Sequence, residues 1–240
     1  MLLSTRGLSK NFAGLRAVED VDFDLPKGEI RALIGPNGAG KTTLVGMISG
    51  RIAPNAGRVM LDGQDITALP AHRRMRLGIA YTFQITSVFG RLSVHENVAL
   101  AARRHMQGTA VEAAVDAALS QVGLAERAAQ DAGDLAYGHQ RLLEIAMGLA
   151  QSPRLLILDE PTQGLAEGEI DSFLRLIREV AEKATILLIE HNMRVVMDLA
   201  DRITVLDGGR VLAEGTPAEI HANRAVQAAY LGGLPNAAAG

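Results

Sequence analysis

Nine consecutive residues match the pattern G-x-x-x-x-G-K-[ST], in which a glycine-rich loop binds phosphate groups. They are Gly35, Pro36, Asn37, Gly38, Ala39, Gly40, Lys41, Thr42 and Thr43. Glycine lets the backbone wrap closely around a polyphosphate, so that successive N–H groups can face it. Lys41 adds a positive charge at the outer phosphates, and the Thr42 hydroxyl suits a Mg²⁺ site. The sequence therefore predicts a protein that binds a nucleoside triphosphate.

The segments on either side of this loop support that interpretation. Residues 29–34 predict a buried strand, and residues 41–49 predict the opening of a helix. A strand that leads through the loop into a helix places the positive end of the helix dipole at the phosphates. An ordinary glycine-rich turn is the alternative, and nine matching residues in this context argue against it.

Two acidic residues, Asp159 and Glu160, directly follow an apolar strand at residues 155–158. A carboxylate at the carboxyl end of a strand beside the phosphate loop is where Mg²⁺ needs a second protein contact, which indicates Asp159. Glu160 would then lie near the terminal phosphate, able to polarise a water for in-line attack. Alone, two acids at a strand end usually indicate only a solvated strand end. Together with the phosphate loop, they indicate hydrolysis.

The composition limits the class of protein. A chain of 240 residues with 48% hydrophobic residues can form one large α/β domain or a domain with a small inserted lobe. Its net charge of -3 argues against a nucleic-acid partner held by bulk electrostatics. Cysteine is absent, which excludes disulfides and thiolate metal sites and fits a cytoplasmic protein. We expect no signal peptide and no membrane span, and therefore a soluble chain that can still dock on a membrane protein.

The remaining pattern alternates strands with helices. Residues 1–27 predict two strands joined by a turn, and residues 57–66 predict a hairpin with an Asp-Gly turn. From about residue 94 to residue 132 the chain is alanine-rich and predicts an inserted helical lobe. The other expected elements are a strand at 78–84, helices at 93–106 and 110–122, a helix after Tyr137, a helix at 167–183, a strand at 185–190, a hairpin at 202–215 and one last helix at 217–231. We expect the tail from residue 235 onward to be mobile.

Further motifs occur in a characteristic order. Gln84 follows a strand, Leu135–Arg141 (Leu-Ala-Tyr-Gly-His-Gln-Arg) opens a helix shortly before the acidic pair, and His191 follows another strand. Together with the phosphate loop, these motifs resemble the nucleotide-binding subunit of an ABC transporter. The resemblance extends from Phe12 to about Leu231.

The resemblance implies a fold and a division of the chain. The fold would be α/β, a P-loop NTPase core of the ABC type with an N-terminal antiparallel β subdomain and an inserted α-helical subdomain. Residues 1–240 would form a single ABC ATPase domain. Residues 1–83 and 154–231 would form the RecA-like core with the β subdomain. Residues 84–153 would hold the Q-loop and the helical subdomain with its signature motif, and residues 232–240 would be a flexible tail.

The resemblance also implies roles for individual residues. Phe12 would stack on the adenine of ATP, and Val18 would help line that pocket. Gln84 would lie near Mg²⁺ and the attacking water, Glu160 would act as the general base, and His191 would hold the terminal phosphate. The implied catalytic residues are Lys41, Gln84, Glu160 and His191, and the implied Mg²⁺ contacts are Thr42, Gln84 and Asp159.

Partners follow from the same resemblance. Ala136, Tyr137, Gly138 and His139 of the signature would contact ATP bound by a second subunit, so the active form would be a head-to-tail dimer with itself or with a paralogous ATPase. Two integral membrane permease subunits would dock on the stretch from Gln84 to Glu96, and a substrate-binding protein outside the membrane would act indirectly. The chain would be peripheral, on the cytoplasmic side of a bacterial inner membrane, with no nucleic-acid partner.

Two residues depart from the family pattern. The signature has Ala136 where the family usually has serine, which removes a hydroxyl donor to the partner's terminal phosphate. The loop after Glu160 ends in Ala166 where an aspartate is usual, which removes a carboxylate from the dimer interface. Both departures put the usual cross-subunit contacts in doubt, and a different partner subunit could supply what is missing.

Several stretches resemble the branched-chain amino acid uptake branch of the family. They are residues 81–84, 92–98, 135–146, 188–193, 215–220 and 229–232. Importers of urea and short-chain amides share much of this pattern and remain an alternative. A soluble ABC ATPase that acts on ribosomes or DNA is an alternative of another class, although a single domain without a long heptad run does not favour it. An exporter is a third possibility.

Overall fold

The computed structural model describes residues 1–82 and 87–231, so Gln84 and the tail from residue 232 lie outside the described residues. The described chain divides into two compact units. The first unit comprises residues 1–71 together with the segment from residue 189, and the second comprises residues 72–188.

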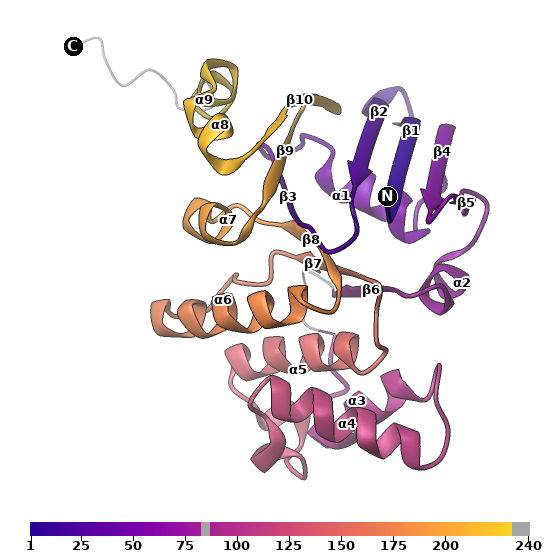
Figure 1. Cartoon of the computed structure of the whole chain (residues 1–240), viewed down its shortest axis with the longest axis vertical. Helices are drawn as coiled ribbons and strands as arrows, with labels where there is room; N and C mark the ends of the chain where they lie inside the picture. The colour runs from indigo at the N-terminus through magenta and orange to yellow at the C-terminus, as the bar shows by residue number, and fades with distance from the viewer. Residues whose placement is uncertain (83–86, 232–240) are drawn as a thin grey trace. The chain divides into compact units, whose positions relative to one another are not determined.

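An antiparallel sheet opens the first unit. Its strands are β1 (Leu3–Phe12), β2 (Leu15–Leu25), β4 (Ala56–Leu61) and β5 (Gln64–Asp65), in the order β2-β1-β4-β5. Figure 1 shows β1, β2 and β4 side by side. Both expected hairpins of this region are confirmed, because β1 pairs with β2 and β4 pairs with β5 across the Asp-Gly turn.

Three further strands of the first unit include the one that leads into the phosphate loop. β3 (Ile30–Ile34) runs parallel to β9 (Arg202–Asp207), with Ile34 opposite Val205. β9 and β10 (Arg210–Gly215) form the expected closing hairpin. The helix α1 (Lys41–Ser49) follows the loop with the bounds that the sequence predicts. The short helix α7 (Met193–Leu199), which precedes β9 in the chain, was not predicted.

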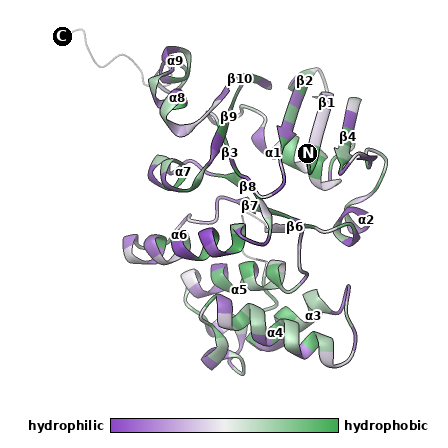
Figure 2. Ribbon diagram, viewed as in Figure 1, coloured by the Kyte–Doolittle hydropathy of each residue, from purple (hydrophilic) through white to green (hydrophobic). Residues whose placement is uncertain are grey.

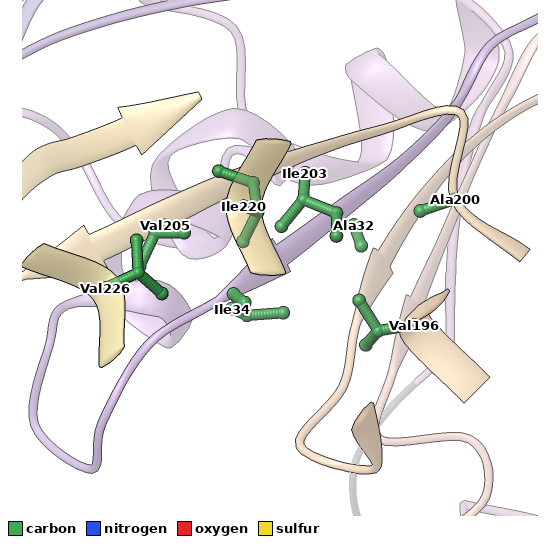
Figure 3. Close-up of a cluster of buried hydrophobic side chains, with 8 residues drawn as sticks. All are labelled: Ala32, Ile34, Val196, Ala200, Ile203, Val205, Ile220 and Val226. Atoms are coloured by element: carbon green, nitrogen blue, oxygen red, sulfur yellow. The ribbon is translucent and has the colours of Figure 1, made fainter. Parts of the chain in front are cut away.

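A cluster of small aliphatic side chains forms the core around these strands (Figure 3). β3 and β9 contribute residues from one side, while α7, α8 (Pro217–Ala222) and α9 (Arg224–Leu231) contribute from the other. The buried members are Ala32, Ile34, Val196, Ala200, Ile203, Val205, Ile220 and Val226. The C-terminal helices therefore cover the strand that leads into the phosphate loop.

The expectation of one last helix over residues 217–231 is wrong. The helix is interrupted at Asn223, whose backbone is extended with φ −78° and ψ 114°. Asn223 Oδ1 accepts hydrogen bonds from the backbone N–H groups of Ala225 at 2.9 Å and Val226 at 3.2 Å. A short amide side chain that bonds its own backbone in this way favours a helix start over a helix interior. Asn223 therefore begins α9.

The second unit contains parallel strands that hold the acidic pair. β6 (Ile79–Thr82) pairs with β7 (Leu155–Asp159) in parallel, with Ile79 opposite Leu155, and β8 (Thr185–Ile189) is the neighbour of β7 on its other side. Every residue of β7 and β8 is buried, which explains their continuous aliphatic sequences. A six-residue helix, α2 (Ala71–Arg76), precedes β6 and was not predicted.

Helices make up the rest of the second unit. The lobe predicted between residues 94 and 132 contains α3 (Val94–Ala102), α4 (Thr109–Gln121) and two short 3₁₀ turns, and α3 ends four residues before the expected position. Two longer helices follow, α5 (Tyr137–Leu149) and α6 (Glu167–Ala181), and α6 carries both polar and apolar segments (Figure 2). The buried face of α6 has helical spacing and consists of Ile170, Phe173, Leu174, Leu176, Ile177 and Val180. Among the described residues, no helix is long and apolar enough to cross a bilayer.

Candidate functional site

The loop between β3 and α1 has a backbone that requires glycine. Gly35, Gly38 and Gly40 have φ values of 152°, 80° and 98°. A Cβ on Gly35 would lie 2.1 Å from the carbonyl oxygen of Leu206, and one on Gly40 would lie 2.3 Å from that of Ala17. The loop is therefore held tightly against β9 and β2, while Gly38 has open space around it. This is the shape of a backbone cradle for an anion.

Charge at the loop also suits an anion. Lys41 Nζ donates to the carbonyl oxygens of Gly35 at 2.7 Å and Pro36 at 3.1 Å, so the ammonium group lies over the loop itself. The first turn of α1 has no acidic residue, and Thr42 is exposed at its start. Uncompensated N–H groups at a helix N-terminus carry partial positive charge. The loop, Lys41 and the helix end thus offer backbone N–H groups and positive charge of the kind that suits a phosphate chain.

Two residues expected at the adenine differ in their surroundings. Phe12, at the end of β1, leaves 44% of its surface exposed, and Lys10 Nζ lies 5.2 Å from the centre of its ring. An exposed aromatic face with an adjacent cation is available for stacking. Val18 is fully buried and lies next to Gly40. Val18 therefore packs against the phosphate loop at Gly40.

His191 lies in the first unit, two residues after the end of β8, and it is exposed. The preceding residue, Glu190, is buried, and its Oε2 accepts from the backbone N–H groups of His191 at 3.0 Å and Asn192 at 3.1 Å. Asn192 in turn caps α7 through its side chain. Glu190 was not predicted as a site residue, and its effect is to fix the turn that presents His191.

The acidic pair ends β7 in the second unit. Asp159 is buried, and the hydroxyl of Tyr81 from β6 donates to its Oδ2. Glu160 has φ 47°, the left-handed region that costs a residue with a side chain about 1–2 kcal/mol. The carbonyl of Glu160 accepts from Gln163 N at 3.2 Å and begins the turn that leads to α6. A strained backbone at an acidic residue is typical of a functional site.

The signature segment forms the N-terminus of α5. Ala136 is the N-cap residue, with φ −57° and ψ 151°, and it has no side-chain group that could accept from the first turn. No acidic residue lies in that turn, and Tyr137 is 42% exposed. A Cβ on Gly164, in the loop after Glu160, would lie 2.7 Å from the Tyr137 ring. The signature and the loop after the acidic pair are therefore in close contact.

A hollow of about 530 Å³ lies in the second unit near the stretch after Gln84. Its lining includes Ser87 and Phe89 from that stretch, Leu100 from α3 and Glu144 and Met147 from α5. Phe89 and Leu100 are both exposed large hydrophobic residues. An apolar concavity with such residues at its edge is typical of a surface that binds another protein.

Comparison with known proteins agrees with this geometry. The family model described as ABC transporter matches residues 18–163, and that of the branched-chain amino acid ATP-binding cassette transporter matches residues 210–233. The chain is 40% identical to the high-affinity branched-chain amino acid transport ATP-binding protein BraF of Pseudomonas aeruginosa and 41% identical to LivG of Escherichia coli strain K12, each over 96% of this chain and 98% of the relative. The ADP conformation of MJ1267, an ATP-binding cassette of an ABC transporter, superposes with a TM-score of 0.88 at 27% identity, covering 96% of this chain and 98% of that one.

The phosphate loop, the acidic strand end and these matches define an ATPase of the ABC transporter family, with the expected P-loop core, antiparallel β subdomain and helical subdomain. Within that family, the chain belongs with the branched-chain amino acid transport ATP-binding proteins. It binds nucleotide and hydrolyses ATP as a subunit of a transporter.

Proposed function

We propose that the chain powers the import of branched-chain or closely related amino acids. The observation that carries this proposal is the joint match to BraF and LivG along nearly their whole length and to the branched-chain amino acid model at residues 210–233. That second segment covers β10, α8 and α9, which pack on the strand leading to the phosphate loop. The segment that matches the branched-chain amino acid model thus belongs to the core of the unit that carries the phosphate loop.

In the proposed reaction, the loop from Gly35 to Thr43 holds the phosphates of ATP, with Lys41 at the outer ones. Glu160 accepts a proton from the attacking water, and His191 holds the terminal phosphate. Thr42 and Asp159 would bind Mg²⁺, since an exposed hydroxyl at a helix start and an oriented carboxylate are the oxygen ligands that this ion takes. The ion would neutralise charge that develops on the phosphate oxygens. Gln84, which lies outside the described residues, keeps its proposed place near the ion and the water.

We further propose that the active form is a head-to-tail dimer with a second copy or with a paralogous ATPase. The N-terminus of α5 supports this, because it has no side-chain cap and no acidic residue in its first turn, so its positive dipole suits a phosphate brought by another subunit. Ala136 offers no hydroxyl there, so the backbone of Gly138 and His139 would carry the contact. Ala166 likewise offers no carboxylate. A different partner subunit would supply the groups that Ala136 and Ala166 lack.

The permease subunits would dock in the hollow beside Ser87 and Phe89. Its apolar lining and the exposed Phe89 and Leu100 support docking of a short helix from a membrane protein. The stretch from Gln84 to Glu96 would thus receive the permease, within residues 84–153, the proposed Q-loop and helical subdomain. The chain would then be held at the cytoplasmic face of the inner membrane, with a substrate-binding protein on the opposite side.

Co-purification of the tagged chain from gently solubilised membranes of its native host tests this proposal. Two polytopic membrane proteins and a second ATPase are the expected partners. Recovery with ribosomes or nucleic acid and without membrane proteins would overturn the transport role. In the recovered complex, Glu160→Gln should abolish ATP turnover and preserve ATP binding, whereas the exposed control Glu182→Gln should behave as wild type. Unchanged turnover in Glu160→Gln would refute the role of Glu160.

A further inference from the structure

The helix that carries the signature contains a buried ion pair. Arg141 and Glu144 are 3% and 5% exposed, and Nη1 of Arg141 lies 2.8 Å from Oε2 of Glu144. Burying two charges costs several kcal/mol per ion in desolvation, so such a pair adds little to stability even when its geometry is good. Two apolar side chains of similar volume would fill the same space. The contacts at each end of the pair indicate what else it does.

At one end, Glu144 binds the segment that follows Gln84. Its Oε1 accepts from the backbone N–H of Ser87 at 2.7 Å and from the Ser87 hydroxyl at 3.2 Å. Ser87 and Glu144 both line the hollow proposed as the permease site. A carboxylate that holds a backbone N–H by a charge-assisted bond fixes the position of that residue. Any displacement of Ser87 by an occupant of the hollow therefore acts directly on Glu144.

At the other end, Arg141 reaches the proposed general base. Its Nη2 lies 3.5 Å from the carbonyl oxygen of Glu160, at the outer limit of a hydrogen bond. Glu160 is the residue with φ 47°, so its peptide needs support from its surroundings. The Arg141 guanidinium also lies 5.8 Å from the centre of the Tyr137 ring in the signature. The same guanidinium thus contacts Glu144, the Glu160 backbone and the signature.

We propose that Arg141 and Glu144 are positioning residues that connect the hollow at Ser87 with the backbone of Glu160. The planar guanidinium has donors in fixed directions, so a shift of Glu144 changes the direction of the donor that faces the Glu160 carbonyl. Because the proposed base must be placed within a fraction of an ångström, a small shift changes the rate of hydrolysis more than the affinity for ATP. The inference rests on the proposed role of Glu160 and, for its response to an occupant, on the proposed docking in the hollow.

The decisive variant replaces both members of the pair, Arg141→Met with Glu144→Leu. A purely structural role would survive this change, because well-packed apolar residues commonly replace a buried ion pair without loss of stability. If the pair positions Glu160, the same change should lower kcat even though the fold is kept. The matched control, Arg175→Met with Glu179→Leu, removes the same residue types from exposed positions on α6.

The assay uses the tagged chain purified with the partners it retains, and it measures kcat, KM for ATP and the melting temperature. The expected result for the double variant is a kcat lower by about 10-fold to 100-fold, with KM and melting temperature near wild type. The control should match wild type in all three. An unchanged kcat, or a fall that follows a lower melting temperature and a higher KM, would overturn the inference.

Ser87→Ala keeps the inference testable if the double variant does not fold. Ser87 is exposed, and this change removes only the hydroxyl bond to Glu144. Loss of one such bond is expected to lower kcat by about 2-fold to 10-fold at unchanged KM. An unchanged kcat in Ser87→Ala alongside an unfolded double variant would reject the positioning role.

A separate comparison distinguishes this inference from the transport proposal. In the recovered complex, substrate-loaded binding protein should stimulate wild-type turnover, and the double variant should lose both its basal rate and the stimulation. A wild-type complex without any stimulation would contradict the import function alone. A double variant with a normal rate and normal stimulation would contradict the connection through Arg141 and Glu144 alone.

Discussion

The hydroxyl of Tyr81 donates a hydrogen bond to Oδ2 of Asp159, so a tyrosine on β6 orients the carboxylate at the end of β7. This bond engages Oδ2 and restricts how the carboxylate group can turn. If Asp159 binds Mg²⁺ as proposed, Tyr81 supports a metal ligand from outside the coordination sphere. Loss of such a supporting bond commonly lowers metal affinity or activity by about 10-fold to 100-fold.

Tyr81→Phe is therefore expected to raise the Mg²⁺ concentration needed for half-maximal ATP turnover by about 10-fold. The ring remains, so packing around β6 should be conserved and the melting temperature should stay close to that of wild type. ATP binding in the presence of a chelator, measured by calorimetry, should not change. Equal Mg²⁺ dependence in Tyr81→Phe and wild type would show that Asp159 does not need this bond.

Gly40 and Gly38 offer a matched test of the loop geometry. Both have positive φ, but a Cβ on Gly40 would meet the Ala17 carbonyl at 2.3 Å, while one on Gly38 would meet nothing within 4 Å. Gly38→Ala should cost about 1–2 kcal/mol of unfolding free energy from its backbone alone. Gly40→Ala should cost about 1–3 kcal/mol more, because the loop must move away from β2. Urea unfolding measures both, and equal losses would refute the close approach to Ala17.

Lys41→Met tests the cation above the loop. Lys41 Nζ now contacts two carbonyl oxygens of its own loop, and it must turn to the phosphates when ATP binds. A hydrogen bond to a charged group contributes about 1.5–3 kcal/mol, so ATP affinity should fall by at least about 10-fold. The exposed control Lys183→Met should bind ATP as wild type does. The readout is the dissociation constant of ATP from calorimetry.

The start of α8 should make the first unit sensitive to acid. Glu219 accepts from the backbone N–H of Thr216 at 2.7 Å and from its hydroxyl at 3.1 Å, and these bonds hold the pKa of Glu219 below its usual value of 4.5. A carboxyl with a lowered folded-state pKa stabilises the fold above its unfolded pKa, and that contribution disappears as the pH falls through the folded value. Glu219→Gln should therefore show a smaller loss of melting temperature than wild type between pH 6 and pH 3, about the range in which acids titrate. Identical pH profiles would contradict this role.

Elements with a strong local signal were predictable from the sequence. The glycine pattern and the following residues predicted α1 with its observed bounds, and the Asp-Gly and Asp-Gly-Gly turns predicted their hairpins, because glycine at positive φ determines a turn locally. The last helix was predicted as continuous because alanine-rich sequence favours helix at every position around Asn223. Its side-chain bonds to Ala225 and Val226 prevailed over that propensity. The six-residue α2 and seven-residue α7 are too short to show a helical period.

The candidate site was predictable only where its residues belong to contiguous motifs. Lys41, Asp159 and His191 stand in such motifs. Arg141 and Glu144 also lie in the signature stretch, but the sequence predicted no role for them, since an arginine and a glutamate three residues apart on a helix are usually an exposed pair. The role proposed for them rests on contacts with Ser87, 57 positions from Glu144, and with Glu160, 19 positions from Arg141, and both contacts depend on tertiary structure.

The cover of β3 has a consequence for the synthesis of the protein. The backbone N–H of Ile30 is satisfied by the side chain of Asp201, a residue 171 positions later, and the aliphatic side chains that bury β3 come from residues 196–226. A ribosome delivers the chain from its N-terminus at about 5–20 residues per second, so the phosphate loop emerges roughly ten seconds or more before its last neighbours. Until then, β3 lacks its pairing with β9 and the apolar side chains that cover it. The core around the phosphate loop can therefore be completed only when nearly the whole chain has been made.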